Sequence, residues 1–413
     1  MSKKIAVIGL GYVGLPLAVE FGRKFQTIGY DLNESRIQEL NQGFDYTGEI
    51  SKRKFQSSIK LRLTSKLEDL KICNIYIVSV PTPIDSKKQP DLSLLLRATK
   101  SIGSILKKKD IVIYESTVYP GCTEEDCVPV LEKKSGLKYN KDFYCGYSPE
   151  RINPGDKKRT LTKIVKITSG SNPDIATQID KLYSSIIPAG TYKASSIKVA
   201  EAAKVIENCQ RDINISFMNE LSVIFNKMNL DTNEVLEAAG TKWNFLKFKP
   251  GLVGGHCIGV DPYYLTYKAK KLGYDSKIIN SGRELNDNFP NFIYGNIQKN
   301  IKNKKILVLG VTFKENCPDI RNSKVFDILN KLKKDNFEID IYDPYASKDE
   351  VFREYKVKLL DYNEIKEKYY NCILIAVAHT QFVNLNLSEY SKNKDTLIYD
   401  LKGIYNNKNH MRL

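Results

Sequence analysis

The stretch IAVIGLGYVGLPLAVEFGRK, residues 5–24, decides the fold class. Residues 5–8 have the apolar pattern of a short buried strand, and residues 15–24 have a helical pattern. Between them Gly9, Gly11 and Gly14 have G-x-G-x-x-G spacing. A second apolar strand, residues 27–30, ends at Asp31. This order of strand, glycine turn, helix, strand and acid is typical of a dinucleotide-binding unit.

Each part of this unit has a physical reason to bind a dinucleotide. Glycines let the backbone approach a pyrophosphate, and the helix N-terminus that follows attracts its negative charge. A carboxylate at the end of the second strand accepts hydrogen bonds from the adenosine ribose. Asp31 therefore favours NAD over NADP, because it would repel a 2′-phosphate, although Arg36 lies close behind and weakens that preference. The alternative is a tight strand–helix turn without a ligand.

The rest of the chain predicts a second α/β domain and a helical middle. Residues 198–228 contain neither Pro nor Gly and predict one long helix, and residues 323–332 predict another helix. Apolar strand patterns recur at residues 75–80, 111–115, 143–147, 305–310, 338–343, 372–378 and 396–400. We expect two Rossmann-like, doubly wound parallel-sheet domains joined by the long helix and a small helical domain. The second lacks a full G-x-G-x-x-G, so it binds a different nucleotide or serves as an inert lid.

Composition excludes several classes of protein. The net charge of +16 suggests anionic partners, but the basic residues are spread along all 413 residues. No basic tract is interleaved with aromatic residues, which argues against nucleic-acid binding. The eight cysteines form no CxxC pair and only three histidines are present, so we expect no metal site. Unpaired thiols and the lack of an apolar run of ~18 residues favour a cytoplasmic protein that makes no membrane contact.

Candidate catalytic residues follow the predicted strands and line the long helix. Thr82, Thr117 and Glu150 come after strands, where parallel sheets bind their ligands, or else are ordinary turn residues. In the long helix, Lys204, Asn208 and Arg211 are spaced by four and three residues, and Glu201 extends that spacing. This polar stripe predicts the wall of a pocket; the alternative is a solvated face.

A glycine-rich loop, PGLVGGHCIGVD at residues 250–261, surrounds Cys257. A thiolate there can attack an aldehyde, with Asp261 or Lys204 handling protons, unless the cysteine is purely structural. The adjacent His256 does not favour a hydrolase, because neighbouring side chains seldom face each other. Near the start of the second α/β domain, Lys314 and Arg321 suit phosphate binding or surface ion pairs.

Together these motifs resemble the UDP-sugar 6-dehydrogenase family, which includes UDP-glucose and UDP-N-acetylhexosamine dehydrogenases. The resemblance covers essentially the whole chain, in order. It rests on GLGYVGLP at 9–16, STVYPG at 116–121, GGHC at 254–257 with Asp261, and Phe313-Lys314 with Asp319 and Arg321. It implies an NAD-binding domain at residues 1–196, a central dimerisation domain with the cysteine loop at 197–300, and a UDP-sugar-binding domain at 301–413. The family is usually dimeric or larger.

The resemblance further implies a four-electron oxidation of C6 of the sugar, from alcohol through aldehyde to carboxylate, with two NAD molecules used in turn. Cys257 would form a thiohemiacetal and then a thioester, and Lys204 would exchange protons and stabilise the oxyanion. Asn208 and Asp261 would place oxygen and water, and Glu150 would act near the thioester. The implied cofactor residues are Gly9, Gly11, Tyr12, Val13, Gly14, Asp31, Arg36, Thr82, Thr117 and Arg321. The implied substrate residues are Glu150, Arg151, Ile152, Lys204, Asn208, Arg211, Gly254, Phe313, Lys314 and Lys402.

Four segments bear on the identity of the sugar. SPERINPG at 148–155 and ENCQRD at 207–212 resemble the N-acetylhexosamine branch. Residues 164–171 and 240–245 look more like the UDP-GalNAc and UDP-GlcNAc enzymes than the UDP-ManNAc enzymes. We therefore expect a UDP-N-acetylhexosamine 6-dehydrogenase of surface polysaccharide synthesis. The alternatives are a UDP-glucose or UDP-ManNAc 6-dehydrogenase, a two-electron dehydrogenase, or a catalytically inactive nucleotide-binding protein.

Overall fold

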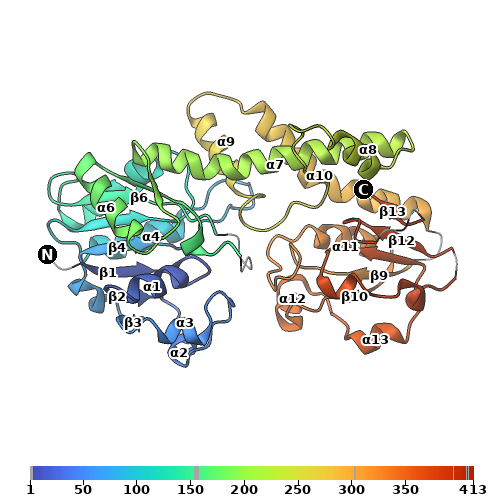
Figure 1. The fold of residues 1–413 in the computed structure, drawn as a ribbon, viewed down its shortest axis with the longest axis horizontal. Helices are drawn as coiled ribbons and strands as arrows, with labels where there is room; N and C mark the ends of the chain where they lie inside the picture. Colours follow the sequence, from blue (N-terminus) through green and yellow to red (C-terminus); the bar gives the residue numbers. More distant parts are fainter. Residues whose placement is uncertain (1–2, 153–157, 302–303, 394, 406, 408) are drawn as a thin grey trace. The chain divides into compact units, whose positions relative to one another are not determined.

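The chain forms two compact units (Figure 1). The computed structural model describes residues 3–152, 158–301, 304–393, 395–405, 407 and 409–413. Unit 1 comprises Met1–Glu207 and Tyr263–Tyr274, and unit 2 comprises Asn208–Pro262 and Asp275–Leu413. The long helix α7 (Ile197–Lys227) begins in unit 1 and ends in unit 2. The two units thus share the predicted central domain, and the three-domain division stays a prediction.

Unit 1 is built on an eight-stranded sheet of order β3-β2-β1-β4-β5-β6-β7-β8. Its strands are β1 (Lys4–Ile8), β2 (Gln26–Tyr30), β3 (Leu61–Thr64), β4 (Ile75–Val78), β5 (Ile111–Tyr114), β6 (Tyr144–Tyr147), β7 (Lys166–Gly170) and β8 (Thr191–Lys193). The central strands β4 and β5 are buried at every residue, because helices cover both faces of such a sheet. The order reverses between β1 and β4, so ligands are expected at the carboxyl ends there.

One strand departs from the predicted parallel pattern. Strand β7 pairs antiparallel with β6, with Tyr147 opposite Ser169, whereas the other paired strands of the sheet are parallel. An antiparallel neighbour needs no crossover helix, and between β6 and β7 the described residues form only the short 3₁₀ turn η3 (Leu161–Lys163). The start of β7 consequently lies at the same edge of the sheet as the end of β6.

Most helices of unit 1 lie in the connections between its strands. They are α1 (Gly14–Gly22), α2 (Glu34–Asn41), α3 (Lys52–Gln56), α4 (Ser93–Gly103), α5 (Val128–Ser135), α6 (Pro173–Ser184) and most of α9 (Asp261–Lys271), with the turns η1 (Leu67–Ile72) and η2 (Thr123–Cys127). In α1 every residue except Glu20 is buried, which explains its almost uniformly apolar sequence. Asn33 caps α2 by accepting a hydrogen bond from the Arg36 amide.

Unit 2 repeats the α/β architecture with a five-stranded parallel sheet of order β10-β9-β11-β12-β13. Its strands are β9 (Lys305–Leu309), β10 (Glu338–Tyr342), β11 (Cys372–Ile375), β12 (Leu397–Asp400) and β13 (Met411–Arg412). Its other elements are α8 (Thr232–Ala239), α10 (Lys277–Asn300), α11 (Val325–Lys334), α12 (Lys348–Tyr355), α13 (Tyr362–Lys366), η4 (Thr380–Phe382) and η5 (Leu387–Tyr390). Two apolar clusters lie on its opposite faces, one containing Ile306 and Val308 and the other Leu307 and Leu309. The predicted fold class is confirmed.

The first turn of unit 2 copies the first turn of unit 1. Gly9 has φ +92° and its amide donates to the Tyr30 carbonyl; Gly310 has φ +91° and its amide donates to the Tyr342 carbonyl. Positive φ values of this size favour glycine, so the backbone conformation of each turn explains why one of its residues is a glycine. The units therefore share the strand–turn–strand geometry of a Rossmann-like fold.

Candidate active site

The glycine turn of unit 1 combines tight packing with an open face. A Cβ atom at Gly14 would lie 1.8 Å from the Gly9 carbonyl oxygen and 2.3 Å from Ser79 Oγ. A Cβ atom at Gly11 would meet no described atom within 4 Å. The packing of the turn thus requires a glycine at position 14. At Gly11 the turn exposes backbone that a pyrophosphate can approach.

Asp31 lies beside an apolar cavity at the carboxyl ends of β1 and β4. Its carboxylate accepts hydrogen bonds from the amides of Leu10 and Asn33, each at 2.9 Å. The cavity has a volume of about 130 Å³, and its lining includes Leu32, Leu67 and Leu94 together with Asp31. An apolar slot next to a ribose-binding carboxylate suits the adenosine part of NAD.

Arg36 is tied to the glycine turn rather than extended into solvent. It is 2% exposed; its Nε donates to the Leu10 carbonyl at 3.1 Å, and its Nη2 lies 2.7 Å from Asp45 Oδ1. Burial alone would raise the pKa of Asp45, but hydrogen bonds from Thr47 and Arg36 lower it. The charge of Arg36 is therefore neutralised locally, which supports the preference for NAD over a cofactor with a 2′-phosphate.

The segments that follow strands β4 and β5 contact each other, as expected for neighbouring parallel strands. Thr82 Oγ1 donates to the Thr117 carbonyl at 2.7 Å, and Ser116 Oγ donates to the Val80 carbonyl at 2.6 Å. The hydroxyl of Tyr264, on α9, donates to the Thr82 carbonyl at 2.9 Å. Thr82 and Thr117 are thus held together as the cofactor-binding prediction requires.

Glu150 is buried at the end of β6 and belongs to a cluster of charges. Its Oε1 accepts from the amides of Arg151 and Ile152, both at 2.6 Å, and its Oε2 lies 3.2 Å from Lys166 Nζ. Lys166 also lies 2.6 Å from Glu115 Oε2. The sequence reasoning missed Lys166 and the role of Glu115; the available signal was a lysine inside an apolar strand pattern.

The side chain of Arg151 points to Glu207 and to the backbone of its own segment. Its Nη2 lies 2.8 Å from Glu207 Oε1, and its Nη1 donates to the Val165 carbonyl at 3.0 Å. Ile152 is partly buried. Residues 153–155, which complete the motif that resembles the N-acetylhexosamine branch, lie outside the described residues.

The polar stripe of α7 differs from the predicted one at a single residue. Glu201, Lys204 and Asn208 are buried, but Arg211 is exposed and Asp212 is fully buried. Asp212, four residues after Asn208, continues the buried face. The stripe is not a solvated face, and Arg211 does not lie on its buried side.

Glu201 clamps the loop that carries Thr117. Its carboxylate accepts hydrogen bonds from the amides of Gly121 at 2.5 Å and Thr123 at 2.9 Å. Gly121 has φ +96° at the end of the STVYPG motif. Burial raises the pKa of Glu201 to about 7, although these hydrogen bonds lower it.

In unit 2 the cysteine loop runs directly into α9. The Asp261 amide donates to the Cys257 carbonyl at 2.9 Å, and Asn208 Nδ2 donates to Asp261 Oδ2 at 2.6 Å. Asp261 is 1% exposed, whereas Cys257 is only partly buried. The side chains of Asn208 and Asp261 are therefore paired, Cys257 lies one turn before Asp261 along the backbone, and Cys257 is the most accessible of the three residues.

The glycines before Cys257 allow the loop to pack against its neighbours. A Cβ atom at Gly254 would lie 2.6 Å from the Asn322 carbonyl oxygen, and one at Gly255 would lie 2.9 Å from the Phe313 ring. Gly255 also has φ +77°. Larger residues would push the loop away from Phe313 and so displace Cys257.

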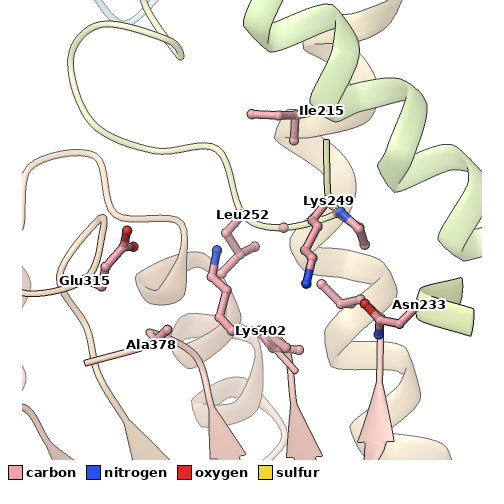
Figure 2. Close-up of a pocket in the computed structure, with 11 residues that line it drawn as sticks. Ile215, Asn233, Lys249, Leu252, Glu315, Ala378 and Lys402 are labelled. Atoms are coloured by element: carbon pink, nitrogen blue, oxygen red, sulfur yellow. The ribbon is translucent and has the colours of Figure 1, made fainter. Parts of the chain in front are cut away.

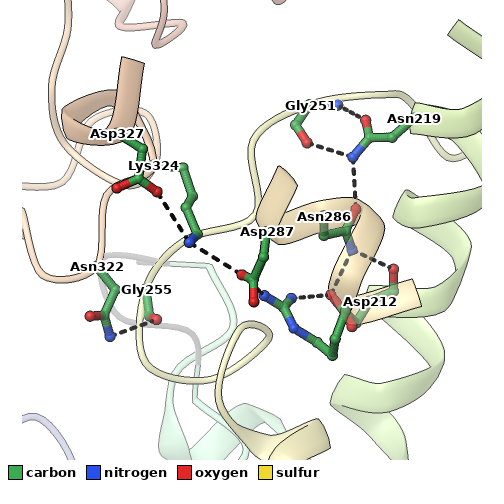
Figure 3. A network of polar contacts seen from close by, with 10 residues as sticks. Asp212, Asn219, Gly251, Gly255, Asn286, Asp287, Asn322, Lys324 and Asp327 are labelled. Atoms are coloured by element: carbon green, nitrogen blue, oxygen red, sulfur yellow. Dashed lines mark hydrogen bonds and ion pairs between the residues drawn. The ribbon is translucent and has the colours of Figure 1, made fainter. Parts of the chain in front are cut away.

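A buried polar network anchors the start of this loop to α7 and α10 (Figure 3). Asn219 accepts from the Gly251 amide at 2.7 Å and donates to the Gly251 carbonyl at 3.1 Å. Asn219 also donates to Asn286 at 2.8 Å, and Asn286 donates to Asp212 Oδ1 at 2.8 Å. Arg283 Nη1 completes the network at 2.6 Å from Asp212. The loop is thus fixed at its base by side chains that sequence reasoning did not select.

His256 and Arg321 both contact Asp319. Arg321 binds Asp319 through two nitrogens, at 3.0 and 2.7 Å, and His256 Nε2 lies 3.3 Å from Asp319 Oδ2. Burial alone would raise the pKa of Asp319, but its bonds to His256 and Arg321 hold it far below its usual range. His256 therefore faces Asp319, as expected for a loop that is not a Cys–His hydrolase site. Arg321, predicted to bind cofactor, is half-exposed and paired with this carboxylate.

A cavity of about 310 Å³ opens at the carboxyl ends of the unit 2 strands (Figure 2). Lys402 follows β12, Ala378 follows β11, and Glu315 follows β9. The amino groups of Lys249 and Lys402 point into the cavity, and Glu315 is the one acidic side chain among the described lining residues. Burial lowers the pKa of Lys402. Two lysines in a concave site suit an anion, and the contact of Lys402 with substrate stays a prediction.

Lys314 and Phe313 lie beside this region but outside the cavity lining that the structure describes. Lys314 Nζ is 5.5 Å from the centroid of the Phe313 ring, and both residues are partly buried. Their contact with substrate stays a prediction.

The carboxylate of Asp343, at the second glycine turn, already has hydrogen-bond partners within the protein. Asp343 corresponds to Asp31, and its carboxylate accepts from the amides of Val311 at 2.7 Å and Tyr345 at 2.8 Å. The buried His379 lies 3.1 Å away through Nε2, while its Nδ1 accepts from the Asn316 amide at 2.9 Å. Because His379 covers Asp343, this turn does not present a ribose acceptor, and the geometry favours a ligand other than a second dinucleotide.

Three domain models of the UDP-glucose/GDP-mannose dehydrogenase family match the chain: the NAD binding domain at residues 3–187, the central domain at 198–288 and the UDP binding domain at 307–407. The chain belongs to this family. It is 54% identical over 409 residues to the UDP-N-acetyl-D-glucosamine 6-dehydrogenase of Salmonella typhi, covering 97% of this chain and 96% of the relative. It is 55% identical over 408 residues to the enzyme of the same name from Pseudomonas aeruginosa, with the same coverage.

Among solved structures, the UDP-D-ManNAc dehydrogenase of Pyrococcus horikoshii superposes with a TM-score of 0.88 at 32% identity, covering 97% of this chain and 96% of the other. The protein is therefore an NAD-dependent UDP-sugar 6-dehydrogenase, as the sequence predicted. Within the described part of the chain, no helix combines the length and apolar character needed to cross a membrane. The individual roles of the site residues stay predictions.

Proposed function

We propose that this dehydrogenase oxidises C6 of UDP-N-acetyl-D-glucosamine to the carboxylate. The observation that carries the proposal is that two bacterial relatives sharing more than half of its residues over nearly their full length have that activity in their names. UDP-GalNAc differs from this substrate only at C4 and remains within the predicted class. UDP-ManNAc and UDP-glucose are the less favoured alternatives.

The residues of unit 1 fit NAD. Gly9, Gly11 and Gly14 would hold the pyrophosphate at the start of α1, with Tyr12 and Val13 supplying backbone of the same turn. The carboxylate of Asp31 would accept from the adenosine ribose, and the cavity beside it would take the adenine. NAD, when bound, accepts a hydride from C6 in each of the two oxidations.

In the proposed mechanism, Lys204 takes the proton of the C6 hydroxyl during the first oxidation. The Cys257 thiolate then adds to the aldehyde carbon, and Lys204 stabilises the oxygen of the thiohemiacetal. Loss of the second hydride leaves a thioester on Cys257. Asn208 and Asp261 orient the oxygen atoms at this carbon, and their mutual hydrogen bond holds both in place.

Hydrolysis completes the reaction. Glu150, with Thr117 placing the water, takes a proton from water as it attacks the thioester carbon. The C–S bond breaks, the thiolate of Cys257 is regenerated, and the carboxylate is released. One water is consumed and two hydrides leave C6, which balances the four-electron oxidation.

The UDP part is assigned to unit 2. Lys249 and Lys402 line a cavity that suits the charge of a pyrophosphate, with Lys314 and Phe313 near it. Gly254 permits close packing at the base of the cysteine loop. Arg151 would contact the sugar, although Glu207 now holds its guanidinium.

The assembly and setting belong to the same proposal. We assign homodimer formation to α7, which exposes apolar residues spaced by seven in each unit: Val199 and Ile206 in unit 1, and Phe217 and Ile224 in unit 2. The eight cysteines are thiols in the structure, which supports a reducing cytoplasm. The uronate product would serve surface polysaccharide synthesis. Three domains, at residues 1–196, 197–300 and 301–413, would bind NAD, form the dimer with the cysteine loop, and bind the UDP-sugar.

The test is the amount of NADH formed per UDP-sugar consumed, measured with UDP-GlcNAc, UDP-GalNAc, UDP-ManNAc and UDP-glucose. We expect two NADH per sugar and the highest kcat/KM with UDP-GlcNAc. Cys257→Ser should fail to release the uronate while still binding UDP, because a hydroxyl without a dedicated base is a weak nucleophile. One NADH per sugar, or wild-type uronate release by Cys257→Ser, would refute the mechanism.

A further inference from the structure

A cluster of four buried side chains lies at the end of β6. Only one of them, Glu150, has a role in the proposed mechanism. Glu115 follows β5, Glu150 follows β6, and Lys166 begins β7, three strands that are neighbours in the sheet. Tyr183, on α6, is the fourth. The exposed fractions of Glu115, Lys166 and Tyr183 are 1%, 2% and 0%, and that of Glu150 is 7%.

The antiparallel pairing of β7 creates this cluster. Because β7 runs opposite to β6, its first residue lies at the edge where β6 ends. A parallel β7 would have placed Lys166 at the far edge of the sheet. The fold thus brings a lysine from the start of one strand to a glutamate beyond the end of the preceding one.

Lys166 lies between the carboxylates of Glu115 and Glu150. Lys166 Nζ lies 2.6 Å from Glu115 Oε2 and 3.2 Å from Glu150 Oε2. The Tyr183 hydroxyl donates to the other oxygen of Glu115. Glu150 receives two backbone amides on Oε1, so both of its oxygens have a fixed donor.

The charges of the cluster explain why the lysine remains an ammonium. An isolated buried ammonium is costly, but two carboxylates within hydrogen-bonding distance offset that cost. Burial lowers the pKa of Lys166, and the two glutamates raise it by more. Burial raises the pKa of Glu115 in spite of Lys166. Without the lysine, two carboxylates would face each other and one would take up a proton.

We propose that Lys166 is a positioning residue for Glu150, holding its carboxylate in a fixed orientation, and that Glu115 and Tyr183 hold Lys166 in place. The inference rests on the proposed function, in which Glu150 assists thioester hydrolysis. Lys166 acts through Glu150 and has no contact of its own with the substrate. Among the residues that the structure describes, the charged groups facing Glu150 are Lys166 from β7, Glu115 from β5 and, along its own segment, Arg151 with its partner Glu207.

The test uses the full-length enzyme with UDP-GlcNAc in a rapid-mixing experiment. Lys166→Met should form two NADH per active site at a rate close to that of the wild type. Its steady-state turnover should then fall about ten- to a hundredfold, because general-base assistance is weakened. Intact-mass measurement should show a sugar thioester accumulating on Cys257.

Two further variants separate positioning from simple structural support. Lys166→Arg keeps the charge and should retain much more hydrolysis than Lys166→Met; equal losses in both would overturn the proposal. Lys163→Met is the matched control, since Lys163 is an exposed lysine in the same segment, and it should behave as the wild type. If Lys166→Met does not fold, the thioester level of Tyr183→Phe decides, because Tyr183 holds Glu115 and through it Lys166; an unchanged level would overturn the proposal.

Failure of the proposed function gives a different pattern. If the wild type forms no NADH with UDP-GlcNAc or the other three sugars, the proposed function fails. If Glu150→Gln hydrolyses the thioester at the wild-type rate, the role of Glu150 fails, and the Lys166 proposal is overturned with it. If Glu150→Gln is slow and Lys166→Met is not, Lys166 alone is excluded.

Discussion

A single carboxylate, that of Asp31, performs two tasks in the glycine turn. It holds the Leu10 amide and the Asn33 amide, and it borders the cavity assigned to adenosine. Asp31→Ala should weaken NAD binding about ten- to a hundredfold, since it removes the partly buried carboxylate that would accept from the ribose. It should also narrow the gap between NAD and NADP, because the repulsion of a 2′-phosphate disappears.

The measurement for Asp31 is the initial rate with each cofactor over a range of concentrations. Glu34→Gln is a suitable control, because Glu34 is an exposed acid three residues away in the first turn of α2. A wild type that prefers NADP, or an Asp31→Ala variant with unchanged KM for NAD, would show that Asp31 serves the turn alone.

Helix α7 carries the next prediction, through Glu201 and the loop that it clamps. The pKa of Glu201 is raised from 4.5 to about 7 by burial, so between these values the folded state holds a proton that the unfolded state has lost. Stability contributed by this group is therefore present below about pH 4.5 and is lost as the pH rises toward 7. The loss is roughly 3 kcal/mol by linkage.

Glu201→Gln removes this titration, so the difference in unfolding free energy between variant and wild type should change with pH over that window. Chemical denaturation at pH 5, 6 and 7 measures it. Glu220→Gln, an exposed site on the same helix, should leave the pH dependence of the wild type intact. A difference between Glu201→Gln and wild type that stays constant from pH 5 to 7 would contradict the assignment.

At the scale of the whole molecule, the prediction concerns assembly. Phe217 and Ile224 are 51% and 44% exposed on α7, and such apolar stripes on a long helix are usually covered by a partner. Phe217→Asp should therefore convert a dimer into a monomer in sedimentation experiments at micromolar concentration. Leu272→Asp, at a residue 74% exposed beyond α9, should not change the mass. A wild type that sediments as a monomer would remove the dimer from the proposal.

The sequence by itself determined the features that depend on local pattern. The glycine turn, its flanking strands and Asp31 are where residues 5–31 predicted them, because glycine spacing and apolar runs act over a few residues. The predicted helix at 198–228 is α7, Ile197–Lys227. The cysteine loop was also singled out in advance, because glycines crowd a cysteine there, and the resemblance to the family gave a role to Asn208 and Asp261, which the structure pairs.

Only the tertiary structure decided the features that depend on how distant segments pair. The antiparallel β7 delivers Lys166 to Glu150, and no local pattern encodes the direction of a strand relative to its neighbour. Asp212 rather than Arg211 lies on the buried face of α7, because Arg283 and Asn286 of α10 pack against Asp212 and donate hydrogen bonds to it. His379 covers Asp343 across 36 residues of chain, so it is the folded sheet that distinguishes the acid of the second turn from Asp31.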